Sequence, residues 1–191
     1  MNLPEPRDLQ ALRAAVDRGW RPKYVFFWGH TGNEGAVGKE CLSQWYPAPF
    51  EIGGVRYATA EHWMMAEKAR LFGDHQAAER AVAAPHPGAA KQVGREVRGF
   101  DHALWEERRS AIVVAGNRAK FTQHAPLHDF LAGTGARVLV EASPVDRIWG
   151  IGLAANDDRA ADPRAWDGLN LLGFALMEVR AELAGEADFG D

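Results

Sequence analysis

Two opposite charges on one predicted helix, Glu61 and Lys68, are the residues best placed to do chemistry. Projecting residues 61–72 at about 100° per residue puts both charges on the side that carries the apolar side chains Met64, Met65, Leu71 and Phe72. Burying an unpaired ion costs several kcal/mol, so two charges kept on an inward face suggest a site. They are about 10 Å apart along the helix axis and could flank a ligand or reach each other.

The chemistry of this pair follows from the two side chains. Glu61 falls in the first helical turn, where the positive end of the helix dipole favours a carboxylate. Such a carboxylate could position a water or stabilise the cationic sugar of an N-glycosidic transition state. A desolvated Lys68 would have a lowered pKa and could act as a nucleophile or a proton donor. The same pattern is equally typical of a buried ion pair or polar network that only fixes helix packing.

The elements that must position these side chains are mostly helical. Helical spacing and end signals predict helices over residues 7–18, 59–72, 76–84, 89–97, 103–118 and 171–183. Composition predicts strands over residues 23–28 and 137–142, and Gly53-Gly54 predicts a hairpin over residues 52–57. The expected fold class is therefore mainly α (α+β), a single domain of several helices with small β elements.

Details of three segments add to this expectation. The helix over residues 59–72 should be capped by Thr59 and stopped by Gly73, with His62 on its outward side and therefore solvated or capping. The strand over residues 137–142 should deliver Glu141, Asp146 and Trp149 to one end of the sheet. Pro85 and Pro87 should end the helix over residues 76–84. The residues after Leu183 should fray.

Composition excludes several classes of protein. The chain has 191 residues, 47% of them hydrophobic and 25% charged, which suits one soluble domain. A net charge of -4 argues against a protein held on nucleic acid mainly by phosphate neutralisation. Cys41 is the only cysteine, so no internal disulfide or thiolate zinc cage can form, and a cytoplasmic location is expected. No targeting or membrane-spanning segment is predicted.

Familiar catalytic motifs do not occur in the sequence. There is no Gly-x-Ser-x-Gly elbow, no His-Glu-x-x-His and no Walker box, and the glycines between Gly29 and Gly38 match no phosphate-binding or dinucleotide fingerprint. The histidines never fall at convincing metal spacing. We therefore expect no metal and no cofactor, and metal-free carboxylate chemistry. Six tryptophans beside polar or glycine-rich sequence could supply flat walls for bases or sugars, although core packing is the alternative for each.

Several ordered blocks resemble a known family. They are Leu42-Ser43-Gln44-Trp45-Tyr46-Pro47, Tyr57–Ala69 with its Glu61-His62-Trp63 core, Ala90–Arg95, Trp105, Ala119-Lys120-Phe121, Leu139–Ala142, Asp146–Gly152 and Asn170–Arg180. Together they are similar to the NADAR, or YbiA-like, family over residues 24–183. The resemblance implies a mainly helical fold with a pocket for phosphorylated ribosyl compounds. Its members are associated with N-glycosidic cleavage of early riboflavin-pathway intermediates and with removal of ADP-ribose from modified guanine.

The resemblance also implies roles for residues. Glu61 matches the family's catalytic glutamate and Lys68 the lysine seven residues on, for which an imine with ring-opened ribose is a hypothesis. The expected substrate-binding residues are Trp45, Trp105, Lys120, Glu141, Asp146, Trp149 and Gly150. Lys120 enters as a candidate phosphate contact, together with Lys39, Lys91 and Arg95.

Two departures from the family pattern bear on specificity. Many members have Phe-Ser-Asn-Phe where this chain has Leu42-Ser43-Gln44-Trp45, so a longer amide replaces a shorter one. The segment over residues 29–40 is longer than in compact members and is expected at the pocket rim as a substrate selector.

The sequence thus predicts an N-glycosidase that removes ADP-ribose from ADP-ribosylated guanine in nucleosides or DNA. The alternatives are hydrolysis of early riboflavin-pathway intermediates and a non-catalytic ADP-ribose-binding module. The expected partners are an ADP-ribosyl or ribose-phosphate small molecule and, as a second candidate, ADP-ribosylated DNA, without a membrane. The expected organisation is an N-terminal helix over residues 1–20 packed on the domain, the NADAR-like domain over residues 21–184 and a frayed acidic tail over residues 185–191.

Overall fold

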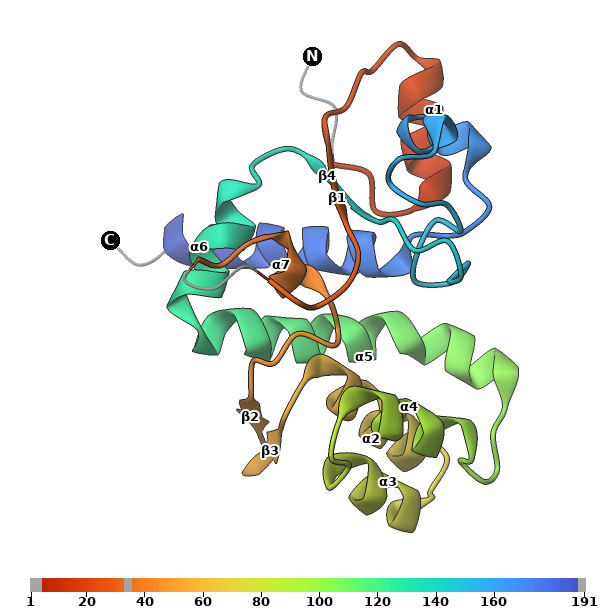
Figure 1. Cartoon of the computed structure of the whole chain (residues 1–191), viewed down its shortest axis with the longest axis vertical. Helices are drawn as coiled ribbons and strands as arrows, with labels where there is room; N and C mark the ends of the chain where they lie inside the picture. Colours follow the sequence, from red (N-terminus) through yellow and green to blue (C-terminus); the bar gives the residue numbers. More distant parts are fainter. Residues whose placement is uncertain (1–4, 33–35, 189–191) are drawn as a thin grey trace. The chain divides into compact units, whose positions relative to one another are not determined.

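The computed structural model describes residues 5–32 and 36–188, with no account of the side chains of residues 186–188 (Figure 1). The chain divides into two compact units. We call residues 44–125 the middle unit, and residues 1–43 together with 126–191 the split unit. The predicted fold class is confirmed, because helices dominate and the strands are few and short.

The middle unit is a group of four helices with one hairpin. Its elements are β2 (Phe50–Ile52), β3 (Val55–Tyr57), α2 (Ala60–Leu71), α3 (His75–Val82), α4 (Pro87–Arg95) and α5 (His102–Gln123). Helix α2 packs against α3, α4 and α5. The predicted hairpin is confirmed: β2 and β3 pair antiparallel, and Gly53 and Gly54 have φ angles of 58° and 79°, which glycine adopts without strain.

Helix α2 is buried around most of its circumference rather than along one face. His62 is 0% exposed, although the helical projection places it on the outward side, and its neighbour Trp63 is 8% exposed. That prediction was wrong because three neighbouring helices surround α2, and a helix at the centre of such a group needs no polar face. His62 Nδ1 lies 2.8 Å from Thr59 Oγ1, and its Nε2 lies 3.1 Å from Ala84 O. Burial lowers the pKa of His62, which favours the neutral ring.

The hydrogen bond to His62 changes the expected role of Thr59. Thr59 is the N-cap residue of α2, but its side chain makes no capping bond to the helix backbone. At the other end, Gly73 has a φ of 71° and follows the helix, as predicted. Helix α3 ends at Val82, before Pro85, as predicted, and Pro87 begins α4, because the first turn of a helix needs no N–H from that position.

The split unit combines a parallel strand pair with helices from both ends of the chain. Its elements are α1 (Leu9–Asp17), β1 (Tyr24–Phe27), the 3-10 helix η1 (Lys39–Leu42), α6 (Ala125–Gly133, from its second residue), β4 (Val138–Glu141), the 3-10 helices η2 (Asp158–Ala161) and η3 (Pro163–Ala165), and α7 (Leu171–Asp188). Strand β1 pairs with β4 in parallel register, with Tyr24 opposite Val138 and Phe27 opposite Glu141. Helix α7 packs on β4.

Three helices differ from the sequence prediction. Helix α6 was not predicted, α5 continues to Gln123 instead of ending at residue 118, and α7 continues to Asp188 instead of fraying after Leu183. Residues 1–4 of the predicted N-terminal segment, residues 33–35 of the predicted rim loop and residues 189–191 of the predicted tail lie outside the described residues.

Candidate active site

Glu61 lies in the first turn of α2 and is 3% exposed. Its backbone N donates a hydrogen bond to Gln44 O over 3.0 Å, so the segment before the hairpin holds the start of the helix. The Gln44 side chain is itself anchored on α5, because Gln44 Oε1 accepts a hydrogen bond from Asn117 Nδ2 over 3.0 Å. Asn117 Nδ2 also donates to Val113 O over 2.9 Å. Hydrogen bonds from Asn117 to Gln44 and from the Glu61 backbone to Gln44 thus hold the start of α2 in position.

This environment suits a functional carboxylate. The N-terminal end of a helix carries a partial positive charge, which stabilises a nearby anion by about 0.3–1 kcal/mol or more when partly buried. Burial also strengthens the interaction of a carboxylate with positive charge that develops on a bound molecule. Glu61 can therefore stabilise a cationic sugar or orient a water that attacks it.

Lys68 lies two turns further along α2 in a corner formed by aromatic rings. Lys68 Nζ donates a hydrogen bond to Gly94 O over 2.7 Å. It lies 4.4 Å from the centroid of the Phe100 ring and 5.5 Å from that of Trp105. Phe72 packs edge-on against Phe100 with the centroids 5.2 Å apart. We call Phe72, Phe100 and Trp105 the aromatic corner.

Burial lowers the pKa of Lys68 from its ordinary value. Lowering the pKa raises the fraction of neutral amine at a given pH, and the neutral amine is the nucleophilic form. The structure brings Lys68, predicted to be catalytic, and Trp105, predicted to bind substrate, together. Phe100 is 44% exposed, so part of the corner is open to solvent and could stack on a planar group.

Trp45 and Lys120 are two further predicted substrate-binding residues of the middle unit. Trp45 is half-buried, and Lys91 Nζ lies 6.0 Å from its ring centroid. Lys120 is 0% exposed, with its Nζ 5.6 Å from the centroid of the Tyr46 ring. The middle unit therefore contains Glu61, Lys68, Trp45, Trp105 and Lys120, and the burial of Lys120 distinguishes it from an ordinary surface lysine.

The other four predicted residues lie in the split unit, at or after the end of β4. Glu141 is the last residue of β4, and its N donates to Asn170 Oδ1 over 3.0 Å. Asn170 Nδ2 in turn donates to Leu139 O over 2.9 Å. Asn170 is the one described non-glycine residue with a positive φ, at 55°. This asparagine joins the start of α7 to the end of the strand.

Asp146, Trp149 and Gly150 form a tight turn after β4. Asp146 Oδ1 accepts hydrogen bonds from Ile148 N over 2.9 Å and from Trp149 N over 2.8 Å. A Cβ atom on Gly150 would lie 2.8 Å from Glu141 O and 3.0 Å from Asp146 O, so only glycine fits there. The structure thus gives Asp146 and Gly150 clear roles in shaping the turn that presents the half-buried Trp149. Their contact with substrate stays a prediction.

Sequence reasoning did not single out three residues that the structure shows in these arrangements. Asn117 stands in the interior of a long helix, where asparagine is disfavoured, and that position is a signal of a buried polar contact. Phe100 follows Gly99, whose φ is 71°, but nothing local points it toward Lys68. Asn170 precedes a predicted helix, a place where asparagine commonly makes backbone hydrogen bonds.

Neither a metal site nor a membrane span is found in the described part of the chain. Residues 5–32 and 36–188 contain no group of three or more His, Cys, Asp or Glu side chains arranged to hold a metal ion. None of the helices they form is long and apolar enough to cross a bilayer.

Comparison with known proteins identifies the family. The model of the NADAR domain matches residues 26–184. N-glycosidase R617 of Acanthamoeba polyphaga mimivirus is 41% identical over 165 residues, which cover 84% of this chain and 96% of that protein. N-glycosidase YbiA of Escherichia coli (strain K12) is 32% identical over 138 residues, covering 72% and 78%. The NMR structure of the E. coli protein YbiA superimposes with a TM-score of 0.72 at 26% identity, covering 90% of this chain and 91% of that one. The chain therefore belongs to the NADAR domain family and is an enzyme of the N-glycosidase type.

Proposed function

We propose that Glu61 and Lys68 carry the N-glycosidase reaction, and that the substrate is guanine bearing ADP-ribose, in nucleosides or in DNA. The observation that carries the proposal is the arrangement on α2. A carboxylate that is 3% exposed starts the helix, and an amine with a lowered pKa lies further along it beside two aromatic rings. A folded protein rarely buries such groups without use.

Glu61 is proposed to act on the sugar. As the bond between C1 and the base nitrogen breaks, positive charge develops on the ribose, and a desolvated carboxylate stabilises that charge more in the transition state than in the ground state. The amide chain from Asn117 through Gln44 keeps the start of α2 in place, so little reorganisation is needed during the reaction. Glu61 could also orient the water that completes hydrolysis.

Lys68 is proposed to act as the nucleophile. Its neutral amine adds to C1 as the bond to the base breaks, and the base leaves with a proton. The ribose ring opens to give an imine between Nζ and C1, and water then hydrolyses the imine to release the sugar as its aldehyde and restore the amine. The lowered pKa of Lys68 supports this role, because the neutral amine is available at lower pH than in an exposed lysine.

The aromatic corner supports a planar leaving group. Phe100 and Trp105 flank Lys68 Nζ, so a base stacked on either ring would stand next to the amine. A net charge of -4 suits a substrate gripped by its ADP-ribose rather than by a long run of DNA phosphates. We place the reaction in the cytoplasm, since a single cysteine suits a reducing compartment.

Substitution of Glu61 tests the first role. Glu61→Gln keeps the size of the side chain and removes its charge, so turnover should fall by about 10²- to 10⁴-fold. Glu67→Gln is a matched control on the same helix, since Glu67 pairs with Arg70 instead of starting the helix. Both variants should melt close to the wild-type temperature. Wild-type-like turnover by Glu61→Gln would remove Glu61 from the mechanism.

The substrate is tested by comparing rates on ADP-ribosylated guanosine, on ADP-ribosylated DNA and on phosphorylated ribosyl-aminopyrimidine intermediates of the riboflavin pathway. Faster release from the guanine substrates supports the proposal, and faster cleavage of the aminopyrimidines selects the second candidate. Calorimetry with ADP-ribose, run beside the product assay, tests the third candidate. Tight binding with no product from any substrate would indicate a binding module.

Borohydride trapping tests the role of Lys68. Reduction during turnover should convert the imine into a stable amine, and peptide mass analysis should locate the adduct on Lys68. Lys91→Arg, which changes a lysine beside Trp45, should still give the adduct, whereas Lys68→Arg should not. An active preparation that never forms the adduct rules out the imine.

A further inference from the structure

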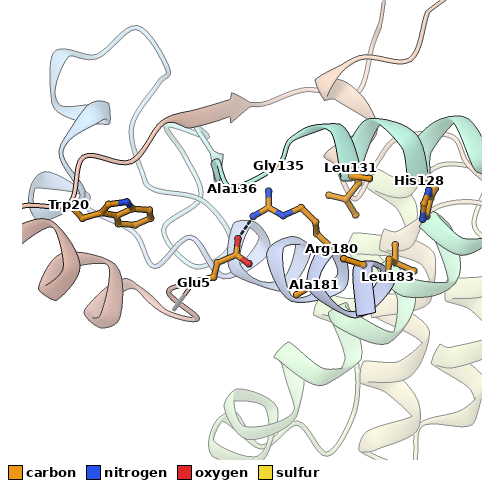
Figure 2. A pocket seen from close by; sticks show the side chains of 11 residues that line it. Glu5, Trp20, His128, Leu131, Gly135, Ala136, Arg180, Ala181 and Leu183 are labelled. Atoms are coloured by element: carbon orange, nitrogen blue, oxygen red, sulfur yellow. Dashed lines mark hydrogen bonds and ion pairs between the residues drawn. The ribbon is translucent and has the colours of Figure 1, made fainter. Parts of the chain in front are cut away.

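A cavity of about 500 Å³ lies wholly within the split unit (Figure 2). It is lined by α6, α7, the chain after α6 and two residues near the N-terminus, Glu5 and Trp20. Most of the lining side chains are apolar: Trp20, Leu131, Ala132, Ala136, Ala181, Leu183 and Ala184. This volume falls in the usual range for small-molecule sites, about 300–1,000 Å³. None of its residues belongs to the proposed catalytic groups.

One buried cation, Arg180, interrupts the apolar lining. Its side chain is 8% exposed and donates hydrogen bonds to Thr134 Oγ1 over 2.7 Å and to Arg137 O over 2.9 Å. It also forms an ion pair with the Glu5 carboxylate. Figure 2 shows this pair between Trp20 on one side and Leu131 and His128 on the other. Arg180 is the one arginine or lysine among the lining residues.

The Glu5 carboxylate is the part of this arrangement that can be exchanged. Thr134 and Arg137 O are neutral acceptors, so among the described residues the negative charge opposite Arg180 comes from Glu5. A buried guanidinium without an anion is costly, and a planar carboxylate matches it best. Glu5 stands outside any helix or strand, and its side chain is 38% exposed, which makes it the accessible member of the pair.

We propose that this cavity binds a small amphipathic carboxylic acid. Its carboxylate replaces that of Glu5 on Arg180, and its apolar body lies against the Trp20 and Leu131 walls. A head group with a single negative charge fits better than a phosphate ester, because one guanidinium faces the cavity. Glu5 then acts as a competitor within the same chain, and it lowers the apparent affinity for the acid by occupying the anchor.

Calorimetry with octanoate and 1-octanol tests the proposal. Octanoate should bind Glu5→Gln at least about tenfold more tightly than wild type, because the competing carboxylate has been removed. The affinity for 1-octanol, which has no charge to place on Arg180, should be the same in both proteins. Glu178→Gln removes an equal charge from an exposed position on α7 outside this cavity and should leave octanoate binding unchanged.

Two further variants place the binding in this cavity. Ala136→Trp and Ala181→Trp each add bulk at an exposed lining position, so both should fold and both should abolish octanoate binding in the Glu5→Gln background. Glycosidase activity, whose proposed groups lie outside this cavity, confirms that the variants are folded. The proposal would be overturned if the octanoate affinity is the same in Glu5→Gln and wild type, or if octanoate still binds to both tryptophan variants.

Discussion

In the middle unit, Glu61 and Lys68 stand on one regular helix, α2, whereas in the split unit Asp146, Trp149 and Gly150 lie along irregular chain after β4. The backbone of α2 satisfies most of its own hydrogen bonds within the helix. Irregular backbone lacks such a regular ladder, so its N–H groups pair one by one with side chains or with more distant backbone carbonyls. The turn after β4 accordingly uses Asp146 for two N–H groups, and Asn170 supports the strand end.

This difference indicates where chemistry and where stability should reside. A charged side chain on a helix that is already hydrogen-bonded is available for a substrate, so its loss should damage turnover more than folding. A polar side chain that holds irregular backbone should damage folding first. Substitutions on α2 should therefore lower activity more than stability, and substitutions after β4 should lower stability more than activity.

Lys68→Met should have the largest effect. It keeps an unbranched chain of similar size in the aromatic corner and removes the amine, so turnover should fall by about 10²- to 10⁴-fold with little change in melting temperature. Lys23→Met, at an exposed lysine just before β1 that has no predicted role in the site, should stay within a few-fold of wild type. Steady-state kinetics and thermal melts measure both. If Lys68→Met instead unfolds and its remaining folded fraction keeps normal turnover, then Lys68 serves the stability of the unit and not the reaction.

The pH dependence of the wild-type rate tests the same amine in another way. Burial lowers the pKa of Lys68, and the reactive form is the neutral amine. The rate should therefore rise with pH through a pKa that lies below the ordinary lysine value, about 10.4, and then level off. A kcat that falls over that interval would mean that the protonated ammonium is the working form and that Lys68 donates a proton.

Asn170→Ala should have the largest effect on stability, in the split unit. Asn170 is 0% exposed, and the change removes its hydrogen bonds to Glu141 N and Leu139 O. It also leaves a Cβ-bearing residue at a φ of 55° without the side-chain bonds that favour this conformation. We expect a loss of about 2–4 kcal/mol in the free energy of unfolding.

Asn170→Gly separates the two causes, since glycine loses the same hydrogen bonds but accepts the positive φ. It should recover about 1 kcal/mol relative to Asn170→Ala. Urea unfolding gives both free energies, provided that the dependence of the free energy on urea concentration has the same slope in each variant. If Asn170→Ala unfolds at the wild-type urea midpoint, the split unit does not depend on the Asn170 side chain for stability. The contrast between the two units would then be wrong.

The sequence was sufficient to predict elements with local signals. The hairpin at Gly53-Gly54, both strands of the parallel pair and most of the helices follow from turn residues and hydrophobic spacing, which act within a few residues. The projection of α2 failed at His62 because burial depends on how many helices surround it. Helix α6 escaped notice, although Pro126 in its first turn and Gly133 at its end are ordinary boundary signals.

Residues of the candidate site also differ in whether local sequence signals could identify them. Glu61 and Lys68 could be found because two charges seven residues apart on an apolar helix are unusual, and the resemblance added Trp105, which indeed lies beside Lys68. The amide pair of Gln44 and Asn117 joins residues that are 73 positions apart. No local pattern specifies such a contact, so it required the folded chain.

Asp146→Ala should have a moderate effect on both stability and binding. The change removes the acceptor for Ile148 N and Trp149 N, and each lost bond costs about 0.5–1.5 kcal/mol in a turn that is partly solvated. Because Trp149 is predicted to bind substrate, KM should rise about 3- to 10-fold while kcat changes less. Asp146→Asn retains an acceptor oxygen and should restore most of the loss. A fall in kcat alone, with KM unchanged, would mean that Asp146 takes part in the chemical step.

Asp74→Asn should have the smallest effect, and it tests whether the middle unit also depends on side-chain support where its backbone is irregular. Asp74 accepts hydrogen bonds from Ala77 N at the start of α3 and from the Arg98 backbone and guanidinium, and Arg98 holds the pKa of this carboxyl well below its usual range. A lowered folded-state pKa adds stability that is complete above the unfolded value, near pH 4, and is lost as the pH falls through the folded value. Asparagine can keep the cap on Ala77 but not the charge. The variant should therefore melt below wild type at pH 7, and the gap between the two melting temperatures should close as the pH falls from about 4 toward 2. A gap that stays constant over this range would show that the negative charge of Asp74 does not contribute to the stability of the unit.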